Sequence, residues 1–98
     1  MGNDEIIERF ASYLAAERRY SPLTVRNYRR DTENFVAWGV ESSGGAFALL
    51  DAKSEDIREW IVSLSESGAL GNASINRTVA SVRALYRYLR REGEIDRD

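Results

Sequence analysis

The residues of this sequence with the clearest capacity for chemistry are its arginines. Thirteen of the fourteen cationic side chains are arginine, and ten of them lie in residues 18–30 and 67–91, two segments without an acidic residue. The guanidinium group forms planar, bidentate contacts with phosphates that lysine cannot form. The two segments carry +10 and the rest of the chain −12, so the net charge of −2 conceals two basic blocks. This pattern favours an anionic partner such as DNA, although a GC-rich genome would equally explain the excess of arginine.

Several kinds of catalysis are excluded by what the sequence lacks. It contains no histidine and no cysteine. Ser-His-Asp and Cys-His catalysis, thiolate zinc sites and disulfide scaffolds are therefore excluded. Paired acids such as Glu55 and Glu59 have the spacing of an exposed helix face rather than of an acid–base pair. We expect no catalytic residue, no cofactor and no metal in this chain.

The length of 98 residues fits a single domain. No apolar run approaches the roughly 20 residues that cross a membrane. The first five residues form neither a basic region nor an apolar run, so we expect no secretory signal. These features predict a cytoplasmic, monomeric domain that makes no contact with a membrane.

Apolar spacing predicts an all-α domain with helices over residues 4–18, 22–38, 55–67 and 73–91. Asn3 or Asp4 is suited to cap the first helix. Ser21 followed by Pro22 is typical of a helix start, and Ser54 is suited to cap the third helix. We expect Trp60, in the apolar stripe of the third helix, to pack in the core rather than to stack on a ligand.

The connection between the second and third helices is predicted to be a loop over residues 40–53. Gly39 is expected to end the second helix. Residues 42–45, Ser-Ser-Gly-Gly, are polar and flexible, which disfavours a helix. We expect three apolar residues to hold the second half of the loop against the core: Phe47, Leu49 and Leu50.

The fourth helix has the clearest two-sided pattern. Its apolar stripe consists of Ile75, Val79, Val82, Leu85, Tyr86 and Leu89. The opposite face carries Ala73, Arg77, Ala80, Ser81, Ala84 and Tyr88. A solvated face normally mixes both signs of charge, whereas this one is small, hydroxylated and positive. Such a face suits a DNA major groove; alternatively, alanine is simply a good helix former and the arginines are solvated.

The start of the second helix has a similar character. Ser21 and Thr24 place hydroxyl groups beside free backbone N–H groups, an arrangement that suits an anion. Arg26, Asn27 and Arg30 point away from the apolar face, where they could reach flanking phosphates or bases. The alternative is that Ser21 caps the helix and binds nothing.

Two segments resemble the opening and the last helix of the N-terminal core-binding domain of Xer-type tyrosine recombinases and phage integrases. The first is Phe10-x-x-Tyr13-Leu14-x-x-Glu17-Arg18-x-x-Ser21-Pro22-x-Thr24-x-x-x-Tyr28-Arg29-x-Asp31. The second is Ser74-Ile75-Asn76-Arg77-x-x-x-x-Val82-Arg83-x-x-Tyr86-x-Tyr88-Leu89-x-x-Glu92-Gly93. The Gly-rich residues 42–45 depart from the short turn of many relatives, which leaves the placement of the third helix open.

The resemblance implies a four-helix SAM-like bundle that clamps one face of a recombination half-site in double-stranded DNA. It implies contacts from the starts of the second and fourth helices: Arg18, Ser21, Thr24, Arg26, Asn27, Arg30, Ala73, Ser74, Arg77 and Ser81. It also implies two protein partners, a C-terminal catalytic domain of the same protein and neighbouring protomers on DNA. We expect the parent protein to be a recombinase and this fragment to bind DNA without cutting it.

The competing hypothesis is a helical adaptor that binds other proteins, because SAM-like folds also serve that function. DNA binding requires the two arginine segments to converge on one face, whereas an adaptor should expose a mixed or apolar patch. Arg58 lies within the acidic residues 31–66, so we expect it to lie outside such a basic face.

Overall fold

A computed structural model describes residues 1–96 of the chain. The elements in chain order are α1 (Asn3–Ala16), α2 (Pro22–Ser42), the short 3-10 helix η1 (Leu49–Asp51), α3 (Ser54–Ser67) and α4 (Asn72–Arg91). Residues 1–96 contain no β-strand. The prediction of an all-α domain with four helices is confirmed.

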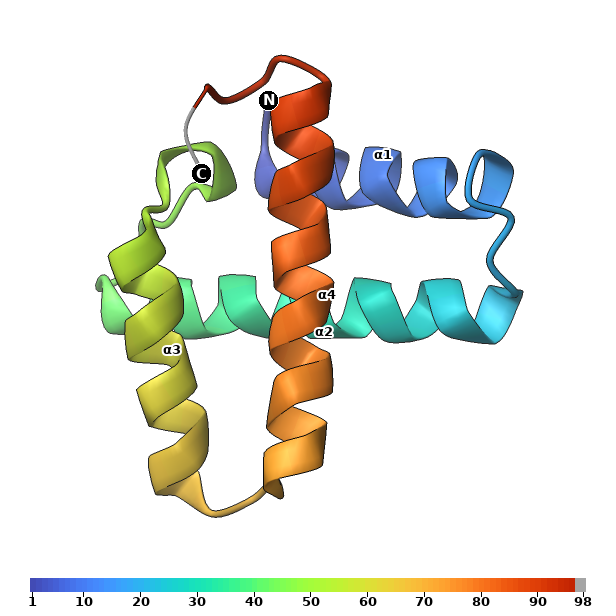
Figure 1. Ribbon diagram of the computed structural model, residues 1–98. Helices are drawn as coiled ribbons and strands as arrows, with labels where there is room; N and C mark the ends of the chain where they lie inside the picture. The colour runs from blue at the N-terminus through green and yellow to red at the C-terminus, as the bar shows by residue number, and fades with distance from the viewer. Residues whose placement is uncertain (97–98) are drawn as a thin grey trace.

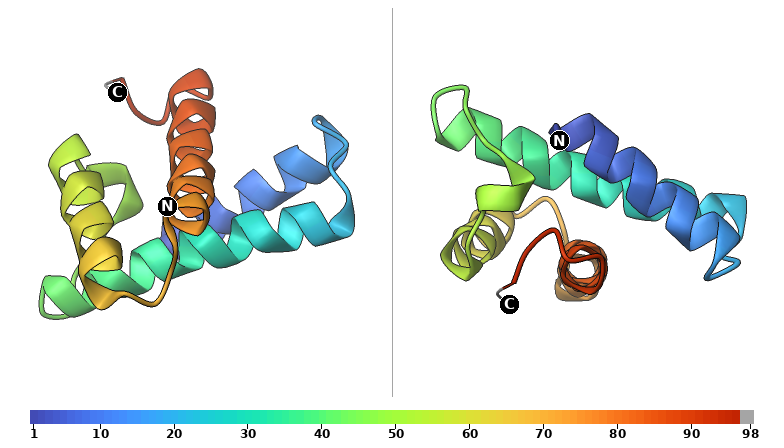
Figure 2. Two further views of the ribbon diagram at one scale, coloured as in Figure 1. Left: turned by 60° about the horizontal axis from the view of Figure 1, so that its bottom comes forward. Right: turned by 90° about the horizontal axis from the view of Figure 1, so that it is seen from above.

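The helices form two pairs that cross steeply. α1 and α2 run alongside each other in opposite directions, and so do α3 and α4 (Figure 1). The second pair lies across α2, as the view from above shows most clearly (Figure 2). Because α4 crosses the middle of α2, the N-terminal halves of these two helices form two arms of one corner. This corner contains most of the predicted DNA-contacting residues.

The core lies where the two pairs meet, and aromatic side chains fill much of it. Phe35 of α2 is completely buried, and its ring centroid lies 4.9 Å from that of Trp60 and 5.3 Å from that of Phe47. Trp60 is only 2% exposed, so its predicted packing role is confirmed. Tilted and edge-on aromatic contacts of this kind add to the free energy gained by burying the rings.

Gly39 does not end α2 as predicted, because the helix continues to Ser42. Gly39 is buried, and a Cβ atom at this position would overlap the ring of Phe47. The glycine therefore makes room for the returning chain. The predicted loop is correspondingly shorter: its first residues are helical and Leu49–Asp51 form η1. Leu49 is fully buried and Phe47 packs against the core, so the predicted anchoring by these side chains is confirmed.

The predicted caps of the first and third helices are wrong. The N-cap of α1 is Gly2. The side chain of Asn3 does not cap the helix; its Nδ2 donates to the Phe47 carbonyl at 2.8 Å. The Asn3 Oδ1 accepts from the Leu49 N–H at 2.9 Å, which ties the start of the chain to the connection before α3. At α3 the N-cap is Lys53, whose N–H donates to the Asp56 carboxylate at 2.8 Å.

Candidate nucleic-acid interface

A buried carboxylate lies at the crossing of α2 and α4. Asp31 of α2 is 1% exposed. Its Oδ2 accepts from Arg77 Nη1 at 3.0 Å, and its Oδ1 lies 3.6 Å from Arg30 Nη2. Both arginine side chains are about half exposed, so each reaches from the buried acid to the surface. A buried carboxylate requires such partners, and in turn it fixes the two guanidinium groups of the corner.

Ser81 does not lie on the outward face of α4, so that prediction is wrong. The residue is 3% exposed, and its Oγ donates to Asp31 Oδ2 at 2.7 Å. Helical spacing places position 81 at the edge of the apolar stripe, and the crossing of α2 covers that edge. A buried hydroxyl that already serves Asp31 is not available to DNA, so we leave Ser81 out of the candidate interface.

The outward face of α4 is narrower than predicted. Ala73, Arg77 and Ala80 are exposed and Ser74 is half-buried. Ala84 and Tyr88 are also half-buried, because this end of α4 packs on α1. The Tyr88 ring centroid lies 4.7 Å from that of Tyr13. The small, exposed surface of α4 is therefore confined to its N-terminal half.

Capping uses both hydroxyl groups at the start of α2. The Ser21 Oγ accepts from the Thr24 N–H at 3.2 Å, as predicted for a cap, and lies 2.9 Å from the Thr24 Oγ1. Beyond this turn Arg26 is exposed and Asn27 is half-buried. Ser21 and Thr24 thus shape the N-terminus of α2, and the positive charge there comes from the Arg26 side chain.

Arg18 is exposed just after the end of α1. Its Nη2 donates to the Tyr20 hydroxyl at 3.0 Å, and its guanidinium carbon lies 5.4 Å from the centroid of the same ring. The hydroxyl of Tyr13 and then the charge of Tyr20 raise the pKa of Arg18 above its ordinary value. These contacts hold the cation against an aromatic surface and leave it accessible.

Two arginines of the basic segments form ion pairs with acidic residues at or beside α1. Arg29 forms an ion pair with Glu8, and this hydrogen bond lowers the pKa of the Glu8 carboxyl. Arg91 Nη2 lies 3.1 Å from Glu17 Oε1 and its guanidinium lies over the Tyr13 ring. The first pair joins α1 to α2, and the second joins Glu17, at the C-cap of α1, to α4. Arg29 and Arg91 therefore contribute to helix packing as well as to surface charge.

The two basic segments meet at two places. One is Asp31, which joins Arg30 of the first segment to Arg77 of the second. The other is a hollow of about 280 Å³ lined by Arg18 of the first segment together with Arg87 and Arg91 of the second. Residues distant in the sequence are therefore brought together, while convergence of all ten arginines on one face stays a prediction.

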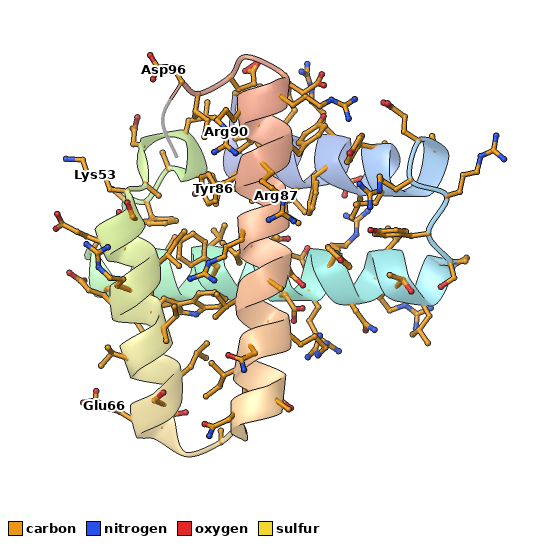
Figure 3. The ribbon with its side chains drawn as sticks, in the orientation of Figure 1. Lys53, Glu66, Tyr86, Arg87, Arg90 and Asp96 are labelled. Atoms are coloured by element: carbon orange, nitrogen blue, oxygen red, sulfur yellow. The ribbon has the colours of Figure 1, made fainter. Side chains whose placement is uncertain are left out.

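Arg58 does not lie apart from the second basic segment, contrary to what its acidic neighbours in the sequence suggest. It lines the same pocket as Arg83, Arg87 and Arg90 of α4. Tyr86 and Arg90 project toward the side of α4 that faces α3, whereas Arg87 projects from its front; Glu66 lies at the far end of α3 (Figure 3). The antiparallel pairing of α3 with α4 causes this approach, and the sequence pattern alone gave no signal for it.

The sequence is similar to those of one known protein family. The sequence model of the phage integrase N-terminal SAM-like domain matches residues 7–93. The chain belongs to this family, so the resemblance stated from the sequence is confirmed. It is similar to tyrosine recombinase XerC of Pseudomonas fluorescens, with 36% identity over 92 residues, which is 94% of this chain and 30% of the relative.

Other relatives give the same result. Tyrosine recombinase XerC of Oceanobacillus iheyensis is 34% identical over 90 residues, which is 92% of this chain and 28% of that relative. The chain thus spans about 30% of the length of the relatives it matches. No solved structure matches it significantly.

Residues 1–96 contain neither a helix that could span a membrane nor a cluster of metal-binding side chains. Within them, no helix has the length and apolar character needed to cross a bilayer. Nor does this part of the chain bring together three or more acidic, histidine or cysteine side chains that could hold a metal ion.

Proposed function

We propose that this chain is the DNA-binding module of a site-specific tyrosine recombinase and that it clamps one face of the recombination half-site. Membership of the integrase family supports a role in recombination. The observation that carries the DNA contact is the crossing of α2 and α4, where Asp31 holds Arg30 and Arg77 at the surface. The corner has two short arms of small or polar residues, which let a duplex approach closely.

The residues of this corner have different roles in the proposal. Arg77 uses Nη1 to bind Asp31 and retains other N–H donors for a base edge, since a guanidinium has five. Arg26 and Arg18 contact phosphates. Thr24, Asn27, Arg30, Ala73 and Ser74 complete the surface, and Ser21 fixes the start of α2.

Strand cleavage belongs, in this proposal, to a C-terminal catalytic domain of the parent protein. The chain contains no histidine, and we expect it to bind DNA without forming a covalent adduct. Further proposed partners are neighbouring protomers on the same DNA. We place the parent protein in the cytoplasm, where its substrate would be, and expect the fragment alone to be a monomer.

An adaptor function has weaker support. The larger exposed apolar side chains are scattered over two helices, the α3–α4 connection and the N-terminus: Leu23 and Val40 of α2, Val62 of α3, Leu70, and Met1. The hollow shared by the two basic segments is instead lined mainly by arginine and aromatic side chains, with Leu14 and Ala84 as the aliphatic ones. An anionic partner therefore fits this surface better than an apolar one.

The proposal is tested by DNA binding of the 98-residue chain. A duplex ligand is selected from a random library, and fluorescence anisotropy then compares it with a scrambled duplex over a range of salt concentrations. Four to six phosphate contacts predict a slope of log K against log salt of about −4 to −5. Affinity that does not depend on salt, or no binding to any duplex at low salt, would contradict the proposal.

A further inference from the structure

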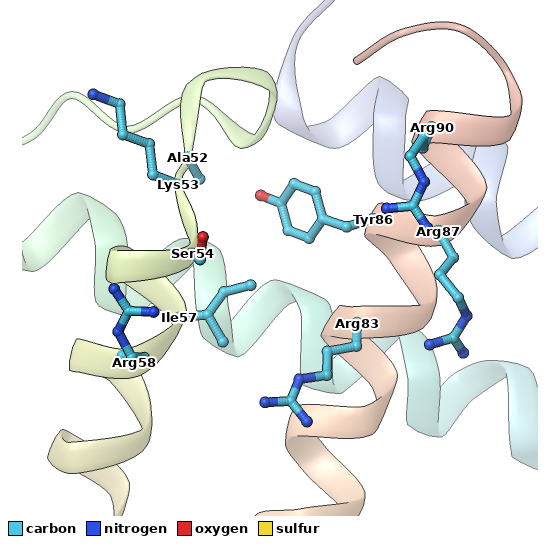
Figure 4. Close-up of a pocket in the computed structure, with 9 residues that line it drawn as sticks. All are labelled: Ala52, Lys53, Ser54, Ile57, Arg58, Arg83, Tyr86, Arg87 and Arg90. Carbon is cyan, nitrogen blue, oxygen red and sulfur yellow. The ribbon is translucent and has the colours of Figure 1, made fainter. Parts of the chain in front are cut away.

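A pocket of about 510 Å³ lies between the start of α3 and the C-terminal half of α4. It is separate from the corner formed by α2 and α4. Its apolar surface comes from Ile57 of α3 and Tyr86 of α4. The Tyr86 ring points across the pocket toward the chain just before α3 (Figure 4), and its hydroxyl donates to the Leu49 carbonyl at 2.8 Å. Arg58 and Arg83 stand on opposite sides, one on each helix, while the ammonium of Lys53 points away from α4 (Figure 4).

Cations surround this pocket, and among residues 1–96 no acidic residue lines it. The lining includes Lys53, Arg58, Arg83, Arg87 and Arg90. Within residues 1–96, Arg58, Arg83 and Arg87 form no ion pair. The charges of these three arginines repel one another across the hollow, and a bound anion relieves that repulsion. The paired state of Arg29 and Arg91 shows that this fold pairs arginines with acids where they serve packing.

The pocket is continuous with the proposed DNA surface. Arg83 and Arg87 also line a groove of about 400 Å³ between α3 and α4. The same groove is lined by Asn76 and Ala80, in the exposed N-terminal half of α4. A strand of DNA that leaves the corner along α4 therefore meets Arg83 and Arg87 next, and then Arg58 across the pocket.

The chemistry of the lining matches the backbone of a nucleic acid. Each nucleotide offers an anionic phosphate and a less polar sugar, and the pocket pairs guanidinium groups with an apolar surface from Ile57 and Tyr86. Most contacts of DNA-binding proteins are to phosphate and sugar, and they position the protein without reading sequence. This match favours a sugar–phosphate chain over a compact inorganic anion.

We propose that this pocket binds the sugar–phosphate backbone of the same duplex, so that α3 takes part in DNA binding through Arg58. The inference rests on the proposed function and extends it. It adds Arg58, Arg83 and Arg87 to a contact set that the family resemblance confined to the starts of α2 and α4. The pocket adds affinity and fixes orientation, while base discrimination stays with the corner.

The test measures DNA affinity of Arg58→Ala and Arg83→Ala in the 98-residue chain. Each should weaken binding to selected and scrambled duplexes alike, by roughly fivefold, and should make the salt slope shallower by about one. The matched control is Arg9→Ala, because Arg9 is exposed on α1 and paired with Glu5. Circular dichroism melts verify that all three variants remain folded.

The outcomes separate this inference from the proposed function. If wild type binds DNA and Arg26→Ala weakens it, while Arg58→Ala and Arg83→Ala behave like Arg9→Ala, the pocket is not a DNA contact and the inference fails alone. If wild type binds no duplex, the proposed function and the inference fail together. Polyglutamate is titrated separately as a second probe: binding to wild type that is lost in Arg58→Ala, while the DNA affinity of that variant is unchanged, would overturn the inference in favour of an acidic protein partner.

Discussion

The Arg77 Nη1 and the Asp31 Oδ2 lie 3.0 Å apart at the crossing of α2 and α4, although 46 positions separate the two residues in the chain. Asp31 is buried, whereas the side chain of Arg77 is half exposed and reaches the surface. The contact therefore links the packing of the two helices to the orientation of an arginine that we place at the DNA. Mutations here should affect stability and binding by different amounts.

Ser81→Ala should separate these two effects. The substitution removes the hydroxyl that donates to Asp31 at 2.7 Å, so we expect the free energy of unfolding to fall by about 1–2 kcal/mol. DNA affinity per folded molecule should stay unchanged, because the side chain is buried. Denaturant melts and anisotropy measure the two quantities. A large loss of affinity without loss of stability would restore Ser81 to the interface.

Arg77→Ala and Arg26→Ala should weaken DNA binding in different ways. Loss of Arg77 should cost about 1–3 kcal/mol on the selected duplex and relax the preference at one base pair. Loss of Arg26 should weaken all sequences about equally and make the salt slope shallower by about one.

Both variants are compared with wild type by anisotropy on selected, single-mismatch and scrambled duplexes, after correction for the folded fraction. The correction matters for Arg77→Ala, which leaves Asp31 with fewer partners. Equal losses on every duplex for both variants would contradict base contact by Arg77.

Gly39→Ala should destabilise the domain although alanine favours helices. A methyl group at this buried position would overlap the Phe47 ring, and overpacking of a core costs about 1–3 kcal/mol. The double variant Gly39→Ala/Phe47→Ala supplies the control, since the second change removes the overlap. Denaturant melts should show the Gly39→Ala penalty shrinking in the Phe47→Ala background. If Gly39→Ala increased the free energy of unfolding, the Phe47 ring would be able to move aside without cost, and the predicted overlap would be wrong.

Trp60→Ala should destabilise the fold by about 3–5 kcal/mol. The side chain is 2% exposed and packs against Phe35 at the centre of the core. Val62→Ala, at an exposed position of the same helix, is the control and should change the free energy of unfolding little. A loss below about 1 kcal/mol at Trp60, measured in the same denaturant series, would show that the indole is not a core group.

Local chemistry was sufficient to predict much of the domain. Apolar periodicity located four helices, and the cap at Ser21 followed by Pro22 marked the start of α2, because both signals act over a few residues. The same holds for burial of Trp60. The sequence by itself also determined that histidine and cysteine chemistry is absent and that most arginines lie in two segments.

Only the tertiary structure decided which residues at the edge of a helix are buried and which distant residues come together. Position 81 is near the boundary of an apolar stripe, and the crossing of α2 buries it against Asp31. Gly39 resembles a helix stop, and only the returning Phe47 explains its place inside α2. Arg58 lies among acids in the sequence, and the pairing of α3 with α4 places it across a pocket from Arg83. These outcomes depend on contacts between distant segments, which no local pattern of residue types specifies.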